Sequence, residues 1–283
     1  MATVEQQARG QRATNFDWRT FPWWLVIIFA FLLLMGYFLI VGVEYNRAFV
    51  FIRGELGSID QLLQGEVVGF IGEGISLTIY TTLVAFLSAM VLGLLAGLGR
   101  ISQNILIRNL AITYVEFVRG VPTLVLIFTL AYVIVPAAVD LIGLEGRSIS
   151  NNSRAIAALA IIYGAYLAEV FRAGIESIAH GQMEAARSLG MTAGQAMRHI
   201  ILPQAVRNIL PALGNDFIAM LKDSSLVSVL AVRDITQLAR LHAGSSFRFR
   251  ESYLVLTFLY LSMTIALSLL LRWYERRLRQ DGR

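Results

Sequence analysis

The chain has 283 residues, of which 57% are hydrophobic and only 15% are charged. A soluble domain carries about 25% charged residues, so a large part of this chain is expected to lie in lipid. Its net charge of +5 comes almost wholly from arginine, which in so apolar a chain indicates membrane orientation and argues against nucleic-acid binding. Because there is no cysteine and the three histidines are dispersed, we expect neither disulfides nor a metal site.

The N-terminal region is predicted to contribute a membrane span of its own. Residues 1–22 form a polar, arginine-containing tail, and residues 23–43 are apolar for about the 20 residues that cross a bilayer. This apolar run is too long for a signal peptide and no cleavage site follows it, so we predict a retained helix. Residues 44–70 mix charged and apolar positions and are expected to be partly helical, outside the cytoplasm and near the membrane interface.

A second span is expected between Gly74 and Gly99, where the sequence has no charged residue. Small residues recur in it every four positions, at Ala89, Gly93 and Gly97. This spacing suits close packing against another helix, although small residues are also common in membrane helices without such a role.

A third span is expected over residues 110–139. Glu116 and Arg119 lie near its start and share a helix face, on which they can neutralise each other. A polar loop then covers residues 140–153 and ends in a serine- and asparagine-rich helix start.

The fourth span, over residues 154–178, holds the ionisable residues Glu169 and Arg172. An ionisable side chain inside a span costs roughly 2.5–3.5 kcal/mol on insertion scales, so the pair needs an explanation. One interpretation is that both residues line a hydrated path and meet a charged solute. The other is a structural ion pair that fixes helix packing. Small residues again form a packing stripe in this span, at Ala160, Gly164 and Ala168.

The most distinctive stretch is the polar segment 184–203, which lies between two apolar regions. Helix-forming residues from Glu184 onward precede Gly190, which can adopt the left-handed conformation that ends a helix. Thr192 then offers an N-cap oxygen, and Gln195 completes a capping box. We therefore predict two short helices joined by a turn and exposed outside the bilayer. The small side chains that would let another protein approach are Ala185, Ala186 and Ser188.

A short helix is expected over residues 206–221, broken at Pro211 and Gly214. Irregular backbone at membrane depth is tolerated only inside protein or beside a watery cavity, so this region is a second candidate for the solute path. Its polar groups in that role are Asn215, Lys222 and Ser224.

Residues 226–250 alternate apolar and polar positions, as an interfacial or gate-forming segment would, and residues 253–271 form a clean last span. A basic tail follows at 276–283. About six spans place both termini and segment 184–203 on one side, which collects most of the arginines and is therefore predicted to be cytoplasmic. The cationic residues between the last two spans disagree with this orientation, and we expect part of that region to be buried in protein.

ATP-binding chemistry is not expected in this chain. A phosphate-binding loop needs Gly-x-x-x-x-Gly-Lys-Ser/Thr, and the sequence contains no Gly-Lys pair. If ATP drives this protein, another chain binds the nucleotide with its magnesium, and this chain has no cofactor and is not itself an enzyme.

Segment 184–203 resembles the EAA loop of permease subunits in ATP-driven importers. The shared pattern is Glu-Ala-Ala, three residues, Gly190, nine residues, Ile200, one residue and Leu202-Pro203. Other segments resemble motifs of polar amino acid importer permeases, and together they cover roughly residues 70–275. These segments are Tyr114–Pro122, Ala168–Gln182, Leu202–Asn215 and Leu221–Leu226.

The resemblance implies an all-α, type I ABC importer permease domain over residues 71–275, with the span at 23–43 as an addition. It implies a bacterial inner-membrane permease for polar amino acids, forming half of a dimer with an identical or homologous chain. Its further partners would be two ATP-binding subunits and an extracytoplasmic solute-binding protein. The ATP-binding subunits would dock on the EAA loop, at Glu184, Ala185, Ala186 and Gly190.

Two alternatives stay open. A self-sufficient secondary transporter or channel for small polar solutes would need its own coupling-ion site, for which Glu169 is thin support. A membrane scaffold or sensor would move no solute at all.

Overall fold

The computed structural model describes residues 23–53, 72–143 and 145–280. Within these ranges every regular element is helical, which confirms the predicted all-α fold. The predicted tail at 1–22, the end of the basic tail and most of the interfacial segment 44–70 lie outside the described residues.

Four helical stretches in the described ranges are long and apolar enough to cross a membrane. Three of them are α6 (Glu73–Arg100), α10 (Asn151–Glu176) and the part Phe249–Arg277 of α15 (Phe249–Gln280). The fourth is the stretch Thr123–Leu141, in which α8 (Thr123–Thr129) continues through a π-helical turn (Leu130–Ile134) into α9 (Val135–Leu141). The pair α2 (Trp23–Val41) and α3 (Val43–Arg53), bent by 99°, adds a fifth if the two helices are counted as one broken span. With the more polar α13 (Leu202–Asp223), the long helices agree with the predicted count of about six spans.

The bend between α2 and α3 falls at Gly42, where the chain folds tightly on itself. A Cβ at this position would lie 2.7 Å from the carbonyl oxygen of Phe38, closer than real Cβ contacts come. The bend turns α3 onto α14 (Ile235–Ser246) and α15, where Ile52, Ile235 and Val255 share a small buried core. The predicted interfacial segment therefore begins as a helix packed on protein.

Helices α6 and α10 pack along the two predicted stripes of small residues. A Cβ on Gly93 would lie 2.6 Å from the Cβ of Leu167, and one on Gly97 would lie 2.8 Å from the carbonyl oxygen of Ala168. Gly164 on α10 is crowded from two sides: a Cβ there would lie 2.7 Å from the Tyr114 hydroxyl of α7 and 3.0 Å from the Cβ of Leu92 on α6. The stripes are therefore contact surfaces, and this interface is part of the main core.

The predicted third span was wrong at its start. The chain first forms a separate helix, α7 (Ile105–Gly120), and the apolar stretch begins only at Thr123. Pro122 causes the break, because the residue before a proline is pushed out of the helical region; Val121 is indeed extended, with φ −111° and ψ 138°. Glu116 and Arg119 consequently lie on α7, ahead of the apolar stretch.

The predicted break at Pro211 and Gly214 was also wrong, because α13 continues through both residues. Pro211 removes one helical N–H, and the Asn215 amide donates to the Pro211 carbonyl oxygen at 3.1 Å. Gly214 is a packing residue: a Cβ there would lie 2.3 Å from a methyl carbon of Leu271 on α15.

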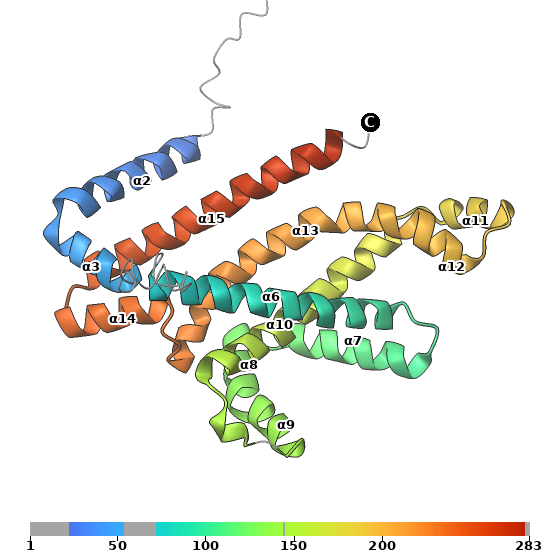
Figure 1. The fold of residues 1–283 in the computed structure, drawn as a ribbon, viewed down its shortest axis with the longest axis horizontal. Coiled ribbons are helices and arrows are strands. Elements are labelled where there is room, and N and C mark those ends of the chain that lie inside the picture. Colours follow the sequence, from blue (N-terminus) through green and yellow to red (C-terminus); the bar gives the residue numbers. More distant parts are fainter. Residues whose placement is uncertain (1–22, 54–71, 144, 281–283) are drawn as a thin grey trace, which may run out of the picture.

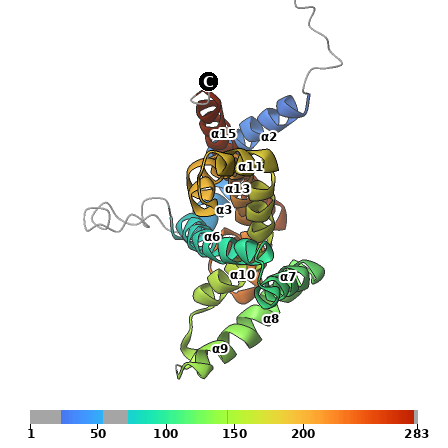
Figure 2. The same ribbon diagram turned by 90° about the vertical axis from the view of Figure 1, so that its right-hand side faces the viewer.

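Figure 1 shows α3 and α14 at one end of the molecule and α11 (His180–Ser188) with α12 (Ala193–Ala196) at the other. Helix α10 leads to this second end, α13 returns from it, and α15 runs toward it (Figure 1). In the turned view of Figure 2, α8 and α9 extend away from the body that contains α6 and α10.

Candidate docking loop and solute path

The segment 184–203, hereafter the docking loop, has the predicted turn between two short helices. Helix α11 begins at His180, ahead of the predicted start at Glu184, and ends before Gly190. Gly190 has φ +85°, the left-handed conformation that favours glycine. Helix α12 then passes through a π-helical turn (Met197–Ile201) directly into α13.

The predicted capping box is also present. The Thr192 hydroxyl oxygen accepts from the Gln195 backbone N–H at 3.3 Å, and the Gln195 side-chain oxygen accepts from the Thr192 N–H at 2.8 Å. These reciprocal bonds satisfy two helix-terminal N–H groups and hold the second short helix at a fixed angle after the turn.

The side chains of the docking loop divide into an outer and an inner set. Glu184, Ala185 and Gly190 are exposed, as a docking surface requires, whereas Ala186 is only 1% exposed and packs inside the loop. Leu189, which was not among the predicted docking residues, is 83% exposed immediately before the turn. An apolar residue next to a helix-ending glycine is the signal that could have found it.

Glu169 and Arg172 form the predicted ion pair, but within a larger network. One Glu169 carboxylate oxygen accepts from Arg172, and the other accepts from Arg100 of α6 at 2.7 Å. Arg172 also bonds Glu176 near the end of α10. Arg100 was not predicted, although its place at the end of an apolar span marks it as a residue that needs a partner.

The predicted pairing of Glu116 with Arg119 is not the one the structure forms. Among the described residues, the ion-pair partner of Glu116 is Arg100, with 3.9 Å between Nη2 and Oε1. Arg100 therefore lies between a carboxylate of α7 and a carboxylate of α10.

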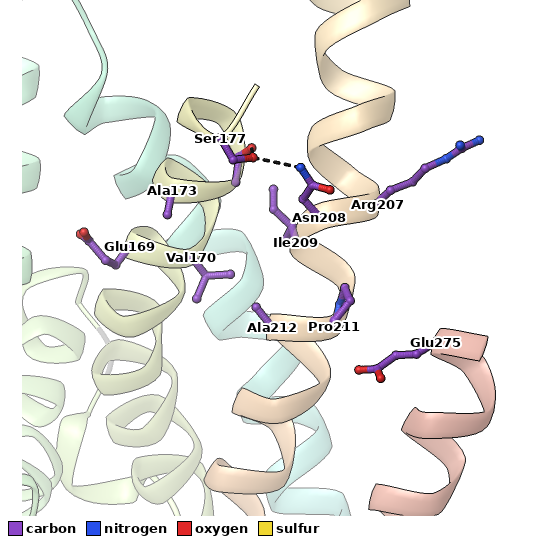
Figure 3. Close-up of a pocket in the computed structure, with 11 residues that line it drawn as sticks. Glu169, Val170, Ala173, Ser177, Arg207, Asn208, Ile209, Pro211, Ala212 and Glu275 are labelled. Carbon is purple, nitrogen blue, oxygen red and sulfur yellow. Dashed lines mark hydrogen bonds between the residues drawn. The ribbon is translucent and has the colours of Figure 1, made fainter. Parts of the chain in front are cut away.

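A cleft of about 800 Å³ lies beside α10, between this helix and α13 (Figure 3). Its polar walls include Arg207 and Glu275, and the Asn208 amide donates to the Ser177 hydroxyl at 3.0 Å. Glu169 borders the same cleft, but its carboxylate points away from α13 (Figure 3).

Of the remaining predicted path residues, Asn215 and Lys222 lie farther along α13, and Ser224 follows its end. Lys222 is exposed in a second cleft, of about 490 Å³, whose walls include hydroxyl groups of Thr236 and Tyr260. Ser224 is buried and donates to the Leu221 carbonyl oxygen at 2.7 Å. Asn215 is exposed and bonded to its own helix. The structure thus places Glu169 and Lys222 in different clefts.

A contact between α10 and the end of α13 was not predicted. The Tyr163 hydroxyl donates to a carboxylate oxygen of Asp223 at 2.8 Å. Asp223 follows Lys222 in the same polar run, so that run was a sufficient signal for a polar contact but not for its partner. In the described part of the chain, no cluster of three metal-ligating side chains occurs.

These features define a helical, multi-pass membrane protein with an exposed, capped loop between two long helices. Residues 89–280 match the family described as binding-protein-dependent transport system inner membrane component. The chain belongs to this family, and it is therefore the membrane permease component of such a transport system.

Individual relatives agree with the family assignment. The chain is 35% identical over 211 residues to the probable amino-acid permease protein YxeN of Bacillus subtilis, covering 75% of this chain and 92% of that protein. It is 32% identical over 207 residues to the glutamine transport system permease protein GlnP of Escherichia coli, covering 73% and 92%. A chain from a crystal structure of an amino acid ABC transporter with histidines matches with a TM-score of 0.65 and 37% identity, over 78% of this chain and 98% of that one.

Proposed function

We propose that this chain is the permease subunit of an ATP-binding-cassette importer that carries polar amino acids across the cytoplasmic membrane. The observation that carries the proposal is the docking loop, which combines the EAA pattern with an exposed, capped helix–turn–helix between α10 and α13. The relatives named as amino-acid and glutamine permeases support the substrate class.

The energy for transport comes from two separate ATP-binding subunits, which bind ATP and magnesium and dock on this loop. Glu184, Ala185 and Leu189 form the exposed surface that meets them, while Ala186 and Gly190 set the shape of the loop. Because α10 enters the loop and α13 leaves it, displacement of the loop shifts two long helices that border a cleft. The complete importer also contains a second permease chain and an extracytoplasmic solute-binding protein.

The docking loop and both chain termini face the cytoplasm in this proposal. The end of α15 supports the assignment, since Arg272, Arg276 and Arg277 are exposed there and positive charge accumulates on the cytoplasmic side. Trp273 and Tyr274 beside them suit the headgroup belt of the membrane, where amphipathic aromatic rings collect.

The solute path runs past Lys222, whose ammonium group can meet the carboxylate of an amino acid in a cleft lined by hydroxyl groups. A role of Asn215 and Ser224 in this path stays a prediction, because each bonds to the backbone of its own segment. A role of Glu169 and Arg172 in meeting the solute stays a prediction, because arginines engage both carboxylate oxygens of Glu169. The secondary-transporter alternative relied on a free Glu169 carboxylate and loses support for the same reason.

The proposal is tested by reconstituting the permease with its ATP-binding subunits in vesicles and supplying the solute-binding protein. Uptake of labelled glutamine, arginine, histidine and leucine is then measured with ATP and with a non-hydrolysable analogue. We expect uptake of at least one polar amino acid that requires ATP hydrolysis. ATP hydrolysis stimulated by the binding protein without uptake of any amino acid would overturn the substrate assignment.

A further inference from the structure

We propose that Arg100 is a positioning residue for energy coupling, which joins α6 and α7 to the end of α10 that leads into the docking loop. The inference rests on the proposed function, because coupling presupposes an ATP-binding partner on the loop. It assigns Glu169 and Arg172 to force transmission and removes them from the solute path.

Arg100 of α6 has ion-pair partners on two other helices, one of them hydrogen-bonded. Its guanidinium donates to Glu169 of α10 at 2.7 Å and lies 3.9 Å from the carboxylate of Glu116 on α7. The Arg100 side chain is only 14% exposed, against 64% for Glu116, so the arginine lies inside the junction and the glutamate at its edge. A partly buried arginine with two carboxylate partners is held more firmly than an exposed surface pair.

The ion pairs continue from this junction toward the docking loop. Glu169 bonds Arg172, and Arg172 bonds Glu176, the last residue of α10, with spacings of three and four residues along one helix face. Helix α11 starts at His180, shortly after this last glutamate. Charges of alternating sign therefore run from the end of α6 to the base of the loop.

Backbone packing makes the same connection stiff. Gly97 lies one turn before Arg100 and allows the α6 backbone to approach the Ala168 carbonyl, next to Glu169. At this point α6 and α10 cannot move closer, because their backbones are already in contact at the glycine. They cannot separate without breaking that contact and the ion pair. A displacement of α10 by the docked partner is therefore passed to α6, whose Arg100 also lies near Glu116 of α7.

The ion pairs also offset part of the cost of placing these charges near lipid. Both Glu169 oxygens and two Arg172 nitrogens are bonded within the network. A solute ammonium group would have to displace an arginine that is already in contact, whereas a mechanical role uses the contacts as they stand.

The test compares the intact complex containing wild-type permease, Arg100→Gln, Arg100→Lys or the matched control Arg108→Gln. Arg108 is an exposed arginine in the first turns of α7. The readouts are complex assembly, thermal unfolding and the number of ATP molecules hydrolysed per solute imported. We expect Arg100→Gln to raise this ratio about three-fold or more, within the range by which mutations modulate coupling between sites. Arg100→Lys should restore part of the coupling, and Arg108→Gln should match the wild type.

A covalent replacement of the ion pair separates a mechanical role from a solute contact. Because the chain has no cysteine, the double variant Arg100→Cys, Glu169→Cys can be joined by a short bifunctional thiol reagent. We expect the ratio of ATP to solute to be high before joining the two cysteines and to fall toward the wild-type value afterwards. Failure of the joined variant to recover, with assembly intact, would overturn the inference.

Failure of the positioning role and failure of the proposed function give different results. An unchanged ratio in Arg100→Gln, including the case in which uptake and hydrolysis fall together, would overturn the positioning role and leave the proposed function standing. A wild-type complex that hydrolyses ATP but imports no solute would overturn the proposed function itself.

Discussion

Gly190 has φ +85°, and nothing lies within 4 Å of the place where its Cβ would be. Space is therefore not the constraint at this position; the backbone conformation is. A β-branched residue in the left-handed region stores about 1–3 kcal/mol of strain, which the turn can release by changing its angle. The direction of the second short helix then changes with it.

We expect Gly190→Val to leave the protein in the membrane but to uncouple ATP hydrolysis from solute uptake. The matched control is Gly181→Val on α11, where space is equally open and φ is not positive. Membrane content, uptake and hydrolysis are measured for both variants. Normal uptake by Gly190→Val at normal membrane content would contradict the role given to the turn.

Leu189 is the second residue whose position suggests a test. It is 83% exposed on the docking loop, and burial of such a leucine against a partner contributes about 1.5–3 kcal/mol. We expect Leu189→Ser to weaken assembly with the ATP-binding subunits. Leu141→Ser is the control, because Leu141 is 88% exposed but belongs to α9, away from the loop. Equal assembly of both variants, measured by co-purification, would exclude Leu189 from the docking surface.

For single residues, local sequence rules predicted the structure correctly where the interaction involves only neighbouring residues. The cap of Thr192 and the turn at Gly190 depend only on neighbouring residues, so the sequence was sufficient to predict them. The burial of Ala186 and the exposure of Leu189 depend on how the loop folds back on itself. The pairing of Arg100 with Glu169 joins residues 69 positions apart, and no local spacing indicates it.

At the scale of helices, the contrast between Pro122 and Pro211 explains which boundaries were predictable. The second half of α7 is mostly apolar apart from Glu116 and Arg119, so the predicted third span included it together with the stretch that begins after Pro122. Pro211, by contrast, lies inside α13 without ending it. A proline disfavours the helical conformation of the residue before it and removes one backbone hydrogen bond. Whether the helix ends there or continues without that bond depends on tertiary packing.

The tight contact between α6 and α10 gives a test at this scale. A Cβ at Gly97 would lie 2.8 Å from a backbone oxygen, which cannot move as a flexible side chain would. Such overpacking costs about 1–3 kcal/mol, although alanine regains up to about 1 kcal/mol of helix propensity. We expect Gly97→Ala to lower the thermal unfolding temperature in detergent.

Gly36 on α2 provides the matched control, because nothing lies within 4 Å of its Cβ position. Gly36→Ala should leave the unfolding temperature unchanged or raise it slightly. If Gly97→Ala behaved in the same way, the interface between α6 and α10 would be looser than its glycines indicate.

At the scale of the whole molecule, orientation is open to direct labelling. The chain has no native cysteine, so single cysteines can be placed at Ser188 on the docking loop and at Ser245 on α14, both exposed and at opposite ends. In sealed cells we expect an impermeant thiol reagent to label Ser245→Cys and not Ser188→Cys. The reverse pattern would invert the proposed topology.

The most direct test of the account asks where the energy for uptake comes from. One set of vesicles contains the permease alone and is tested under ion gradients of either direction. The second set contains the permease with its ATP-binding subunits, and ATP is supplied on the side of the membrane that these subunits face. We expect uptake only in the second set, dependent on the solute-binding protein and abolished when Gly190→Val disrupts the docking loop. Gradient-driven uptake by the permease alone would contradict it.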